Sequence, residues 1–242
     1  NCLMQLSNAK LAIFALILAN VIWGAAFPIY KWALEVLPVY TFTFLRFFVG
    51  SLIILPFALR NFHFQKKDLL TIIFIALTSV TIQIPLLFSG LKLSPSINAP
   101  IIIWSGPIIL IVFSIIFLQE KISQKLLIGT FLSLSGVMLL IFKPEVFNGD
   151  FNAMLGSFLI FLATICGVFQ AILLKKIMHK NDTATIVFLT FLIGSLPLLP
   201  LVISEFNEFS AHLFNTQTFV GLVYGIVFSS VIAHFLLFFG SV

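Results

Sequence analysis

The sequence predicts an all-α integral membrane protein, a helical bundle built of inverted repeats. Three observations lead to this class: a composition that suits lipid, long apolar runs with short connections, and an internal repeat. Of the 242 residues, 61% are hydrophobic and 9% are charged, whereas soluble domains carry about 25% charged residues. Such a chain cannot form a water-facing surface, so a lipid bilayer is its expected surroundings.

Each long apolar run is expected to cross the membrane as an α-helix. A span needs roughly 20 apolar residues for a bilayer core about 30 Å thick, and its backbone polar groups must be satisfied within the helix. A closed β-barrel predicts short alternating segments instead, and residues 101–117 are apolar throughout. We therefore expect eight spans, at residues 11–34, 40–59, 69–91, 97–118, 126–142, 153–177, 183–203 and 218–242.

The positive charges predict the orientation. With the N-terminus in the cytoplasm, nine of the 13 Lys and Arg residues fall in inner loops, three fall outside, and Arg46 falls within a span. This bias follows the positive-inside rule for a multi-pass protein of the cell inner membrane. It also accounts for the net charge of +5, so no nucleic-acid partner is expected. The inner residues are Lys10, Arg60, Lys66, Lys67, Lys121, Lys125, Lys175, Lys176 and Lys180, and the outer ones are Lys31, Lys92 and Lys143.

An internal repeat links the two halves of the chain. Residues 44–56 read FLRFFVGSLIILP and residues 188–200 read FLTFLIGSLPLLP, with eight of 13 positions identical at an offset of 144. Two shorter matches flank it, Trp23-Gly24 with Cys166-Gly167, and LLFSG at 86–90 with LLFFG at 236–240. The repeat unit therefore holds five spans, and an odd number requires the second copy to enter the membrane upside down.

This repeat predicts a first five-span unit at residues 11–142 and a second, inverted unit at residues 153–242. The second unit has counterparts of only the first three spans. By the repeat offset, we expect a full protein of ten spans, about 50 residues longer. The first residue, Asn1, is not a methionine, which also suggests a trimmed chain or a fragment.

Several motifs resemble those of EamA-type members of the drug/metabolite transporter superfamily. The resemblance covers the whole chain, with Gln119 standing where glycine is usual. It implies ten spans in two inverted repeats and transport of small metabolites, often amino-acid export. The matching residues are Asn20, Trp23, Gly24, Phe27 and Lys31, then Arg46-Phe47, Pro107, the stretch QEKIS at 119–123, Gly129 and Gly136-Val137.

Two cationic residues are candidates for substrate binding. A charge near the middle of a bilayer costs about 2.5–3.5 kcal/mol on insertion scales, so Arg46 needs a reason to be there. It is either an anchor for a carboxylate or phosphate, or an arginine that snorkels to a loop carbonyl. Lys31 either joins it in a basic vestibule or pairs with Glu35, four residues on along the same helical face.

Five further residues are candidates for lining the pocket. Trp23, Tyr30 and Trp104 offer aromatic walls and Gln83 offers an amide at depth, although each also suits interhelical packing. His234 is the only histidine within a span. It either serves a proton step or, with Ser230 four residues back on the same face, makes a plain interhelical hydrogen bond.

The predicted function is a secondary transporter of amino acids or related zwitterionic or amphipathic compounds, working outward by alternating access. Membrane enzymes lack support, because no paired membrane aspartates and no G-x-S-x-G motif occur. No P-loop, metal-type cysteine spacing or other cofactor signature is present, so no cofactor is expected. A lipid or lipid-linked-sugar flippase, or a non-transporting membrane assembly subunit, is the alternative. A homodimer is possible.

Overall fold

The computed structural model is helical throughout the part of the chain that it describes, with no strand there. It describes residues 2–113, 151–178, 180–205 and 215–236, with short pieces at 123–125, 128–129, 131–132 and 135. The chain divides into two compact units, unit 1 with Asn1–Phe64 and Asn181–Val242, and unit 2 with Gln65–Lys180. Each unit therefore contains helices from both of the segments that the sequence predicts as repeats.

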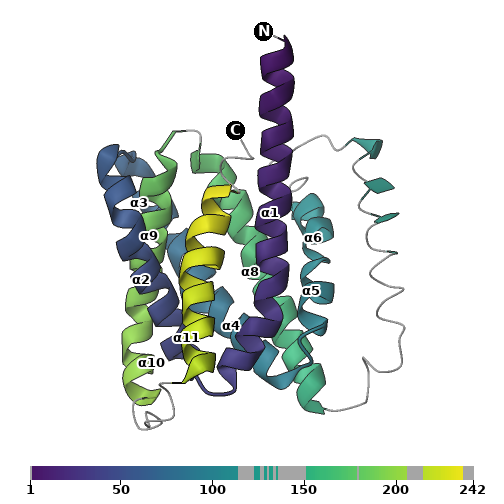
Figure 1. Cartoon of the computed structure of the whole chain (residues 1–242), viewed down its shortest axis with the longest axis vertical. Helices are drawn as coiled ribbons and strands as arrows, with labels where there is room; N and C mark the ends of the chain where they lie inside the picture. Colours follow the sequence, from purple (N-terminus) through teal and green to yellow (C-terminus); the bar gives the residue numbers. More distant parts are fainter. Residues whose placement is uncertain are drawn as a thin grey trace. The chain divides into compact units, whose positions relative to one another are not determined.

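Unit 1 is built of four long helical segments (Figure 1). The first two are unbroken, whereas the other two change helix type along their length. In chain order the elements are α1 (Cys2–Leu34), α2 (Val39–Arg60), α9 (Thr183–Ser195) with η5 (Leu196–Leu198) and α10 (Leu199–Ser204), and α11 (Thr216–Val223) with η8 (Tyr224–Ile232).

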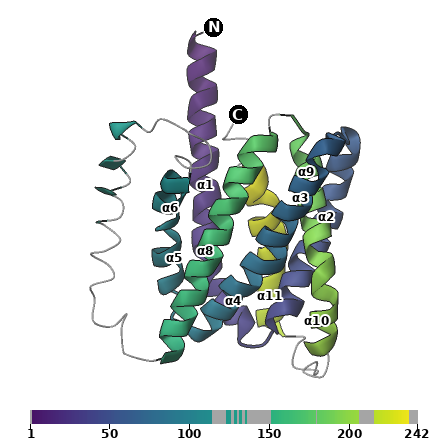
Figure 2. The same cartoon turned by 180° about the vertical axis from the view of Figure 1, so that it is seen from behind.

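Within unit 1, α2 lies against α9 and α10 and runs antiparallel to them (Figures 1 and 2). Where α2 begins, the backbone N–H of Thr41 donates to Glu205, which follows α10, at 2.7 Å. Where α2 ends, the backbone N–H of Asp182, just before α9, donates to the carbonyl of His63 at 3.0 Å. This is the direction that an inverted repeat requires of its second spans.

The third span of each repeat contains a π-helical segment. These segments are η2 (Leu77–Gln83) in unit 2 and η8 in unit 1. At the offset of 150 that relates LLFSG to LLFFG, η2 falls on residues 227–233 and overlaps η8. The expectation of α-helix throughout every span was therefore wrong here. A π-turn bonds residue i to i+5 and is found frequently at functional sites.

Unit 2 packs around the long helix α8 (Phe151–Met178), seen beside α4 in Figure 2. A Cβ added to Gly156 of α8 would lie 2.7 Å from the carbonyl oxygen of Gly90 on α4, so glycine is needed for this close approach. Besides η2, the other described elements of unit 2 are η1 (Lys66–Asp68), α3 (Leu69–Ala76), α4 (Ile84–Leu93), α5 (Asn98–Ile103) and α6 (Gly106–Phe113).

The part of the chain that is described contains six helices long and apolar enough to cross a membrane, not eight. Of the predicted span 97–118, the structure describes residues 97–113, and these hold a shorter apolar stretch, Asn98–Ile111, broken between α5 and α6. Pro107 has no N–H for a helical bond, so α6 restarts beside it. Most of the predicted span 126–142 and the end of 218–242 lie outside the described residues. The six are Leu11–Leu34, Val39–Arg60, Lys66–Leu93, Phe151–Met178, Thr183–Ser204 and Thr216–Leu236.

Candidate functional site

The candidate site is centred on Arg46, which projects from α2 within unit 1. Its side chain is 5% exposed, so it does not reach the surface. The Nε group donates to the hydroxyl of Ser230 at 2.8 Å, and Nη2 donates to the hydroxyl of Ser229 at 3.0 Å. Both serines belong to η8, so a single guanidinium joins α2 to the π-helical segment.

Two aromatic rings also lie beside this guanidinium. Its central carbon lies 4.9 Å from the ring centroids of both Tyr30, on α1, and Phe47, on α2. Cation–π contacts contribute about 2 kcal/mol or more when desolvated, and hydrogen bonds that involve a charged group contribute about 1.5–3 kcal/mol. Together they are large enough to offset the roughly 2.5–3.5 kcal/mol of inserting an arginine at the bilayer centre.

Ser229 has polar contacts with three other side chains. Its hydroxyl accepts from Arg46, and its backbone carbonyl accepts from the indole Nε1–H of Trp23 at 3.1 Å. Nδ1 of His234 lies 3.3 Å from the same carbonyl, a contact that takes Nδ1 as the protonated nitrogen. Ser229 therefore ties α1, α2 and its own helix together.

The π-helical backbone explains why His234 bonds to Ser229. His234 follows Ser229 by five residues, which is the spacing of a π-turn. Ser230, which the sequence analysis places on the same face as His234, has a hydroxyl that accepts from Arg46.

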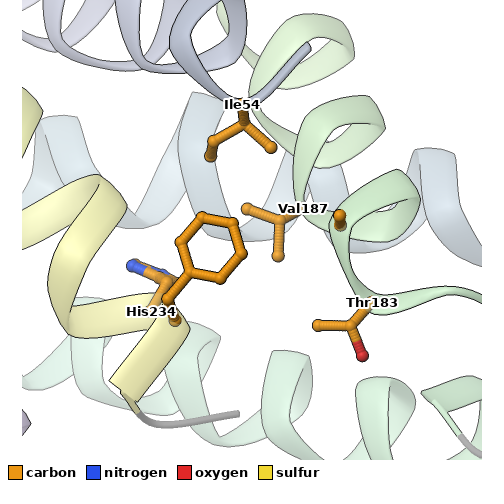
Figure 3. A pocket seen from close by; sticks show the side chains of 6 residues that line it. Ile54, Thr183, Val187 and His234 are labelled. Carbon is orange, nitrogen blue, oxygen red and sulfur yellow. The ribbon is translucent and has the colours of Figure 1, made fainter. Parts of the chain in front are cut away.

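His234 also borders a small pocket within unit 1. Its imidazole packs edge-on against Trp23 and Phe191, with ring centroids 5.6 Å and 5.3 Å apart. Figure 3 shows Ile54, Val187 and Thr183 around the hollow beside His234. Its volume of about 10 Å³ suffices for about one water molecule, so this pocket is too small to be a substrate site.

Four of the residues that the sequence singled out meet in this cluster: Trp23, Tyr30, Arg46 and His234, from three different spans. Sequence reasoning missed Ser229. The signal for it was present, since Ser229-Ser230 is a polar pair in the middle of an apolar run. Its central role depends on the π-turn, which the sequence pattern does not display.

The other three predicted residues lie elsewhere. Lys31 is partly exposed near the end of α1, one turn from Glu35. Gln83 belongs to unit 2, where its amide lies against Gly167, and a Cβ on that glycine would be 2.7 Å from Nε2. Trp104, also in unit 2, is 50% exposed. It was expected well inside its span, but it lies at the break between α5 and α6.

The acidic residues that the structure describes in unit 1 lie at helix ends and are engaged there. Glu205 accepts from the Thr41 hydroxyl at 2.8 Å in addition to two backbone N–H groups at the start of α2. Asp182 caps α9 by accepting from the N–H and the hydroxyl of Thr185, both at 2.9 Å. Glu35 accepts from the amide of Gln217 at 3.2 Å.

Comparison with known proteins gives the family. The model of the EamA-like transporter family matches residues 10–142, more than half of the chain. The chain belongs to this family. The resemblance inferred from the motifs is thereby confirmed, and the protein is a multi-pass membrane transporter.

Two curated relatives and one solved structure show how far the similarity of this EamA-like transporter extends. "Uncharacterized transporter YetK" of Bacillus subtilis is 26% identical over 95% of this chain and 71% of its own length. An "Uncharacterized transporter" of Archaeoglobus fulgidus is 24% identical over 90% of this chain and 76% of its own length. A solved crystal structure has a TM-score of 0.69 at 14% identity, covering 97% of this chain and 78% of its own, so it shares the fold.

Proposed function

We propose that this EamA-like transporter moves a small metabolite with an anionic group across the cytoplasmic membrane, with Arg46 as the anchor for that group. The observation that supports this most is the guanidinium of Arg46, 5% exposed and held by two serine hydroxyls and two aromatic rings. Ionisable residues within membrane spans are costly and commonly mark substrate pathways. The candidate compounds are amino acids and related zwitterionic or amphipathic metabolites, each of which carries such a group.

The proposed mechanism is alternating access, with net movement outward and the N-terminus in the cytoplasm. The antiparallel arrangement of α2 and α9 supports a repeat of opposite topology, the architecture on which alternating access is built in many secondary transporters. The excess of Lys and Arg on one side supports the orientation. Trp23, Tyr30 and His234 belong to the proposed site through their contacts with Ser229 and Arg46.

Flux measurements on the purified protein in proteoliposomes test this function. We expect at least one amino acid or related anionic metabolite in a broad panel to cross faster than in protein-free liposomes. A fluorescent phospholipid and a lipid-linked sugar belong in the same panel. Scrambling of those lipids without flux of any soluble metabolite would overturn the proposal in favour of a flippase, and no flux of either kind would refute transport.

A further inference from the structure

We infer that the Arg46 cradle, defined as Arg46, Ser229 and Ser230, selects a carboxylate monoanion with an apolar body over a zwitterion or a dianion. This rests on the proposed function and narrows its substrate class. Three features of unit 1 lead to it: the donors of the cradle, its net charge, and the places where the acidic and aromatic side chains of the unit are engaged.

The cradle offers both kinds of donor that a carboxylate needs. A serine hydroxyl has one O–H donor and two acceptor lone pairs. Ser229 and Ser230 can therefore accept from Arg46, as they do at 3.0 Å and 2.8 Å, while turning their own O–H toward an incoming anion. A guanidinium flanked by two such hydroxyls presents charged and neutral donors to one oxyanion.

The charge of the cradle sets the charge of its preferred ligand. Arg46 contributes +1 and the two serines contribute none. A monocarboxylate brings the total to zero, whereas a dianion leaves −1 and a zwitterion leaves +1. Uncompensated charge is strongly disfavoured in a low-dielectric site, and the cradle is buried, with Arg46 at 5%, Ser229 at 1% and Ser230 at 0% exposure.

The ammonium group of an amino acid would need an acidic partner in unit 1. The acidic residues described there lie at helix ends and already bind other groups: Glu35 binds Gln217, Asp182 binds Thr185, and Glu205 binds the start of α2. Because each is held to a helix terminus or to a side chain there, none is placed beside Ser229 and Ser230 in the middle of η8.

Aromatic faces are the other common partner of an ammonium group. The nearest ones, Tyr30 and Phe47, already face the guanidinium of Arg46, each with its centroid 4.9 Å away. A second cation at those faces would meet the charge of Arg46. The same rings suit an apolar body, since Phe47 continues into Phe191 at a centroid distance of 4.8 Å.

A matched set of compounds on one carbon skeleton tests the selectivity in proteoliposomes. The set is 4-methylpentanoate as monoanion, leucine as zwitterion, isobutylmalonate as dianion and 4-methylpentanamide as neutral control, each as radiolabelled flux at equal concentration. We expect carrier-mediated flux of 4-methylpentanoate to exceed that of leucine and of isobutylmalonate by about tenfold or more, the scale of one charged hydrogen bond. Equal or faster flux of leucine or of the dianion would overturn the inference.

Serine variants test whether the hydroxyls take part. Ser229→Ala and Ser230→Ala should each raise the KM for 4-methylpentanoate about tenfold, because each removes a donor to the bound carboxylate. Ser51→Ala is the matched control, since Ser51 is buried on α2 and its hydroxyl bonds its own helix at the Phe48 carbonyl. Serine variants that behave like Ser51→Ala would remove the hydroxyls from the site.

The possible outcomes distinguish a failure of this selectivity inference from a failure of the proposed transport function. Flux of leucine without preference for the monocarboxylate leaves transport standing and ends the inference. No flux of any compound in this set or in the wider panel, from protein that is monodisperse in detergent, ends both. Ser229→Thr keeps the hydroxyl and should retain more transport than Ser229→Ala, which distinguishes loss of the donor from loss of folding.

Discussion

Arg46 is tolerable in a membrane span because its partners arrive from three helices. Tyr30 comes from α1, Phe47 from α2, and Ser229 and Ser230 from η8. Gly225 makes room for this arrangement, since a Cβ there would lie 3.4 Å from Cδ of Arg46 and 3.5 Å from Tyr30. The buried charge of Arg46 is thus surrounded by two hydroxyl groups and two aromatic rings.

Trp23→Phe tests whether the hydrogen bond from Trp23 to the Ser229 carbonyl stabilises the fold. The substitution keeps an aromatic ring but removes the Nε1–H that lies 3.1 Å from that carbonyl. We expect the free energy of unfolding to fall by about 0.5–1.5 kcal/mol, the usual contribution of one hydrogen bond. The measurement is the unfolding midpoint in detergent micelles titrated with SDS. The control is Trp32→Phe, at a residue of α1 that is 41% exposed, and equal effects of the two would argue against the bond.

At the scale of single residues, the sequence identified Arg46 as a candidate but did not identify all of the residues that surround it. Arg46, Trp23, Tyr30 and His234 stand out because polar or amphipathic side chains are rare in apolar runs. The Ser229-Ser230 pair is a weaker signal, because serine is common in membrane helices and usually bonds its own backbone, as Ser51 and Ser195 do here. Only the π-turn directs the Ser229 carbonyl toward two other side chains.

Two helix pairs determine how the elements of unit 1 fit together. The pair of α2 with α9 and α10 is joined at both ends, by Glu205 at one and by Asp182 and His63 at the other. The pair of α1 and α11 depends on small residues, because the position of a Cβ on Gly221 is already taken by the Cβ of Ala33. The G-x-x-x-G pattern of Gly221 and Gly225 is typical of such close packing.

Gly221→Ala tests the packing of α1 on α11. The added methyl group would collide with Ala33, so the helices must move apart. We expect a loss of about 1–3 kcal/mol in the free energy of unfolding, as for other overpacked cores. Gly24→Ala on α1 is the matched control, because nothing lies within 4 Å of its added Cβ, and it should be neutral or stabilising by about 0.5–1 kcal/mol. A stable Gly221→Ala would show that α1 and α11 are not so closely packed.

Hydropathy predicted the bounds of the long helices well. It failed where a proline or a π-turn changes the helix locally. The predicted span 11–34 coincides with Leu11–Leu34, and 183–203 differs from Thr183–Ser204 by one residue. The stretch at 97–118 broke because Pro107 follows Gly106 at the start of α6. The π-turns escaped prediction because a single extra residue per turn barely alters an apolar run.

At the scale of the whole molecule, the inverted repeat determines which helix ends share a side of the membrane. In unit 1, Glu35, Thr41, Glu205 and Gln217 are joined at one end, and His63, Asp182 and Thr185 at the other. The motif of 13 residues predicted the repeat, and the odd number of spans in the repeat unit predicted the inversion. It could not predict that helices of both repeats would mix in each compact unit.

Cysteine accessibility tests the orientation. In a chain with Cys2 and Cys166 replaced by serine, Gln217→Cys should react with a membrane-impermeant thiol reagent added outside intact cells. His63→Cys should react only after the cells are opened, because it lies at the end of α2 opposite Gln217 and the charge bias places that end in the cytoplasm. The reverse pattern would refute a cytoplasmic N-terminus, and labelling of both from outside would refute the topology.

The flux of an anionic substrate through the Arg46→Gln variant tests the central claim most directly. The measurement is proteoliposome flux of the best substrate, compared with wild type and with Arg60→Gln, which removes an exposed arginine from the end of the same helix. We predict a loss of about tenfold or more for Arg46→Gln, since its charged hydrogen bonds to the anion are gone, and near wild-type flux for Arg60→Gln. Equal flux through Arg46→Gln and Arg60→Gln would contradict the role of Arg46 as the anion anchor.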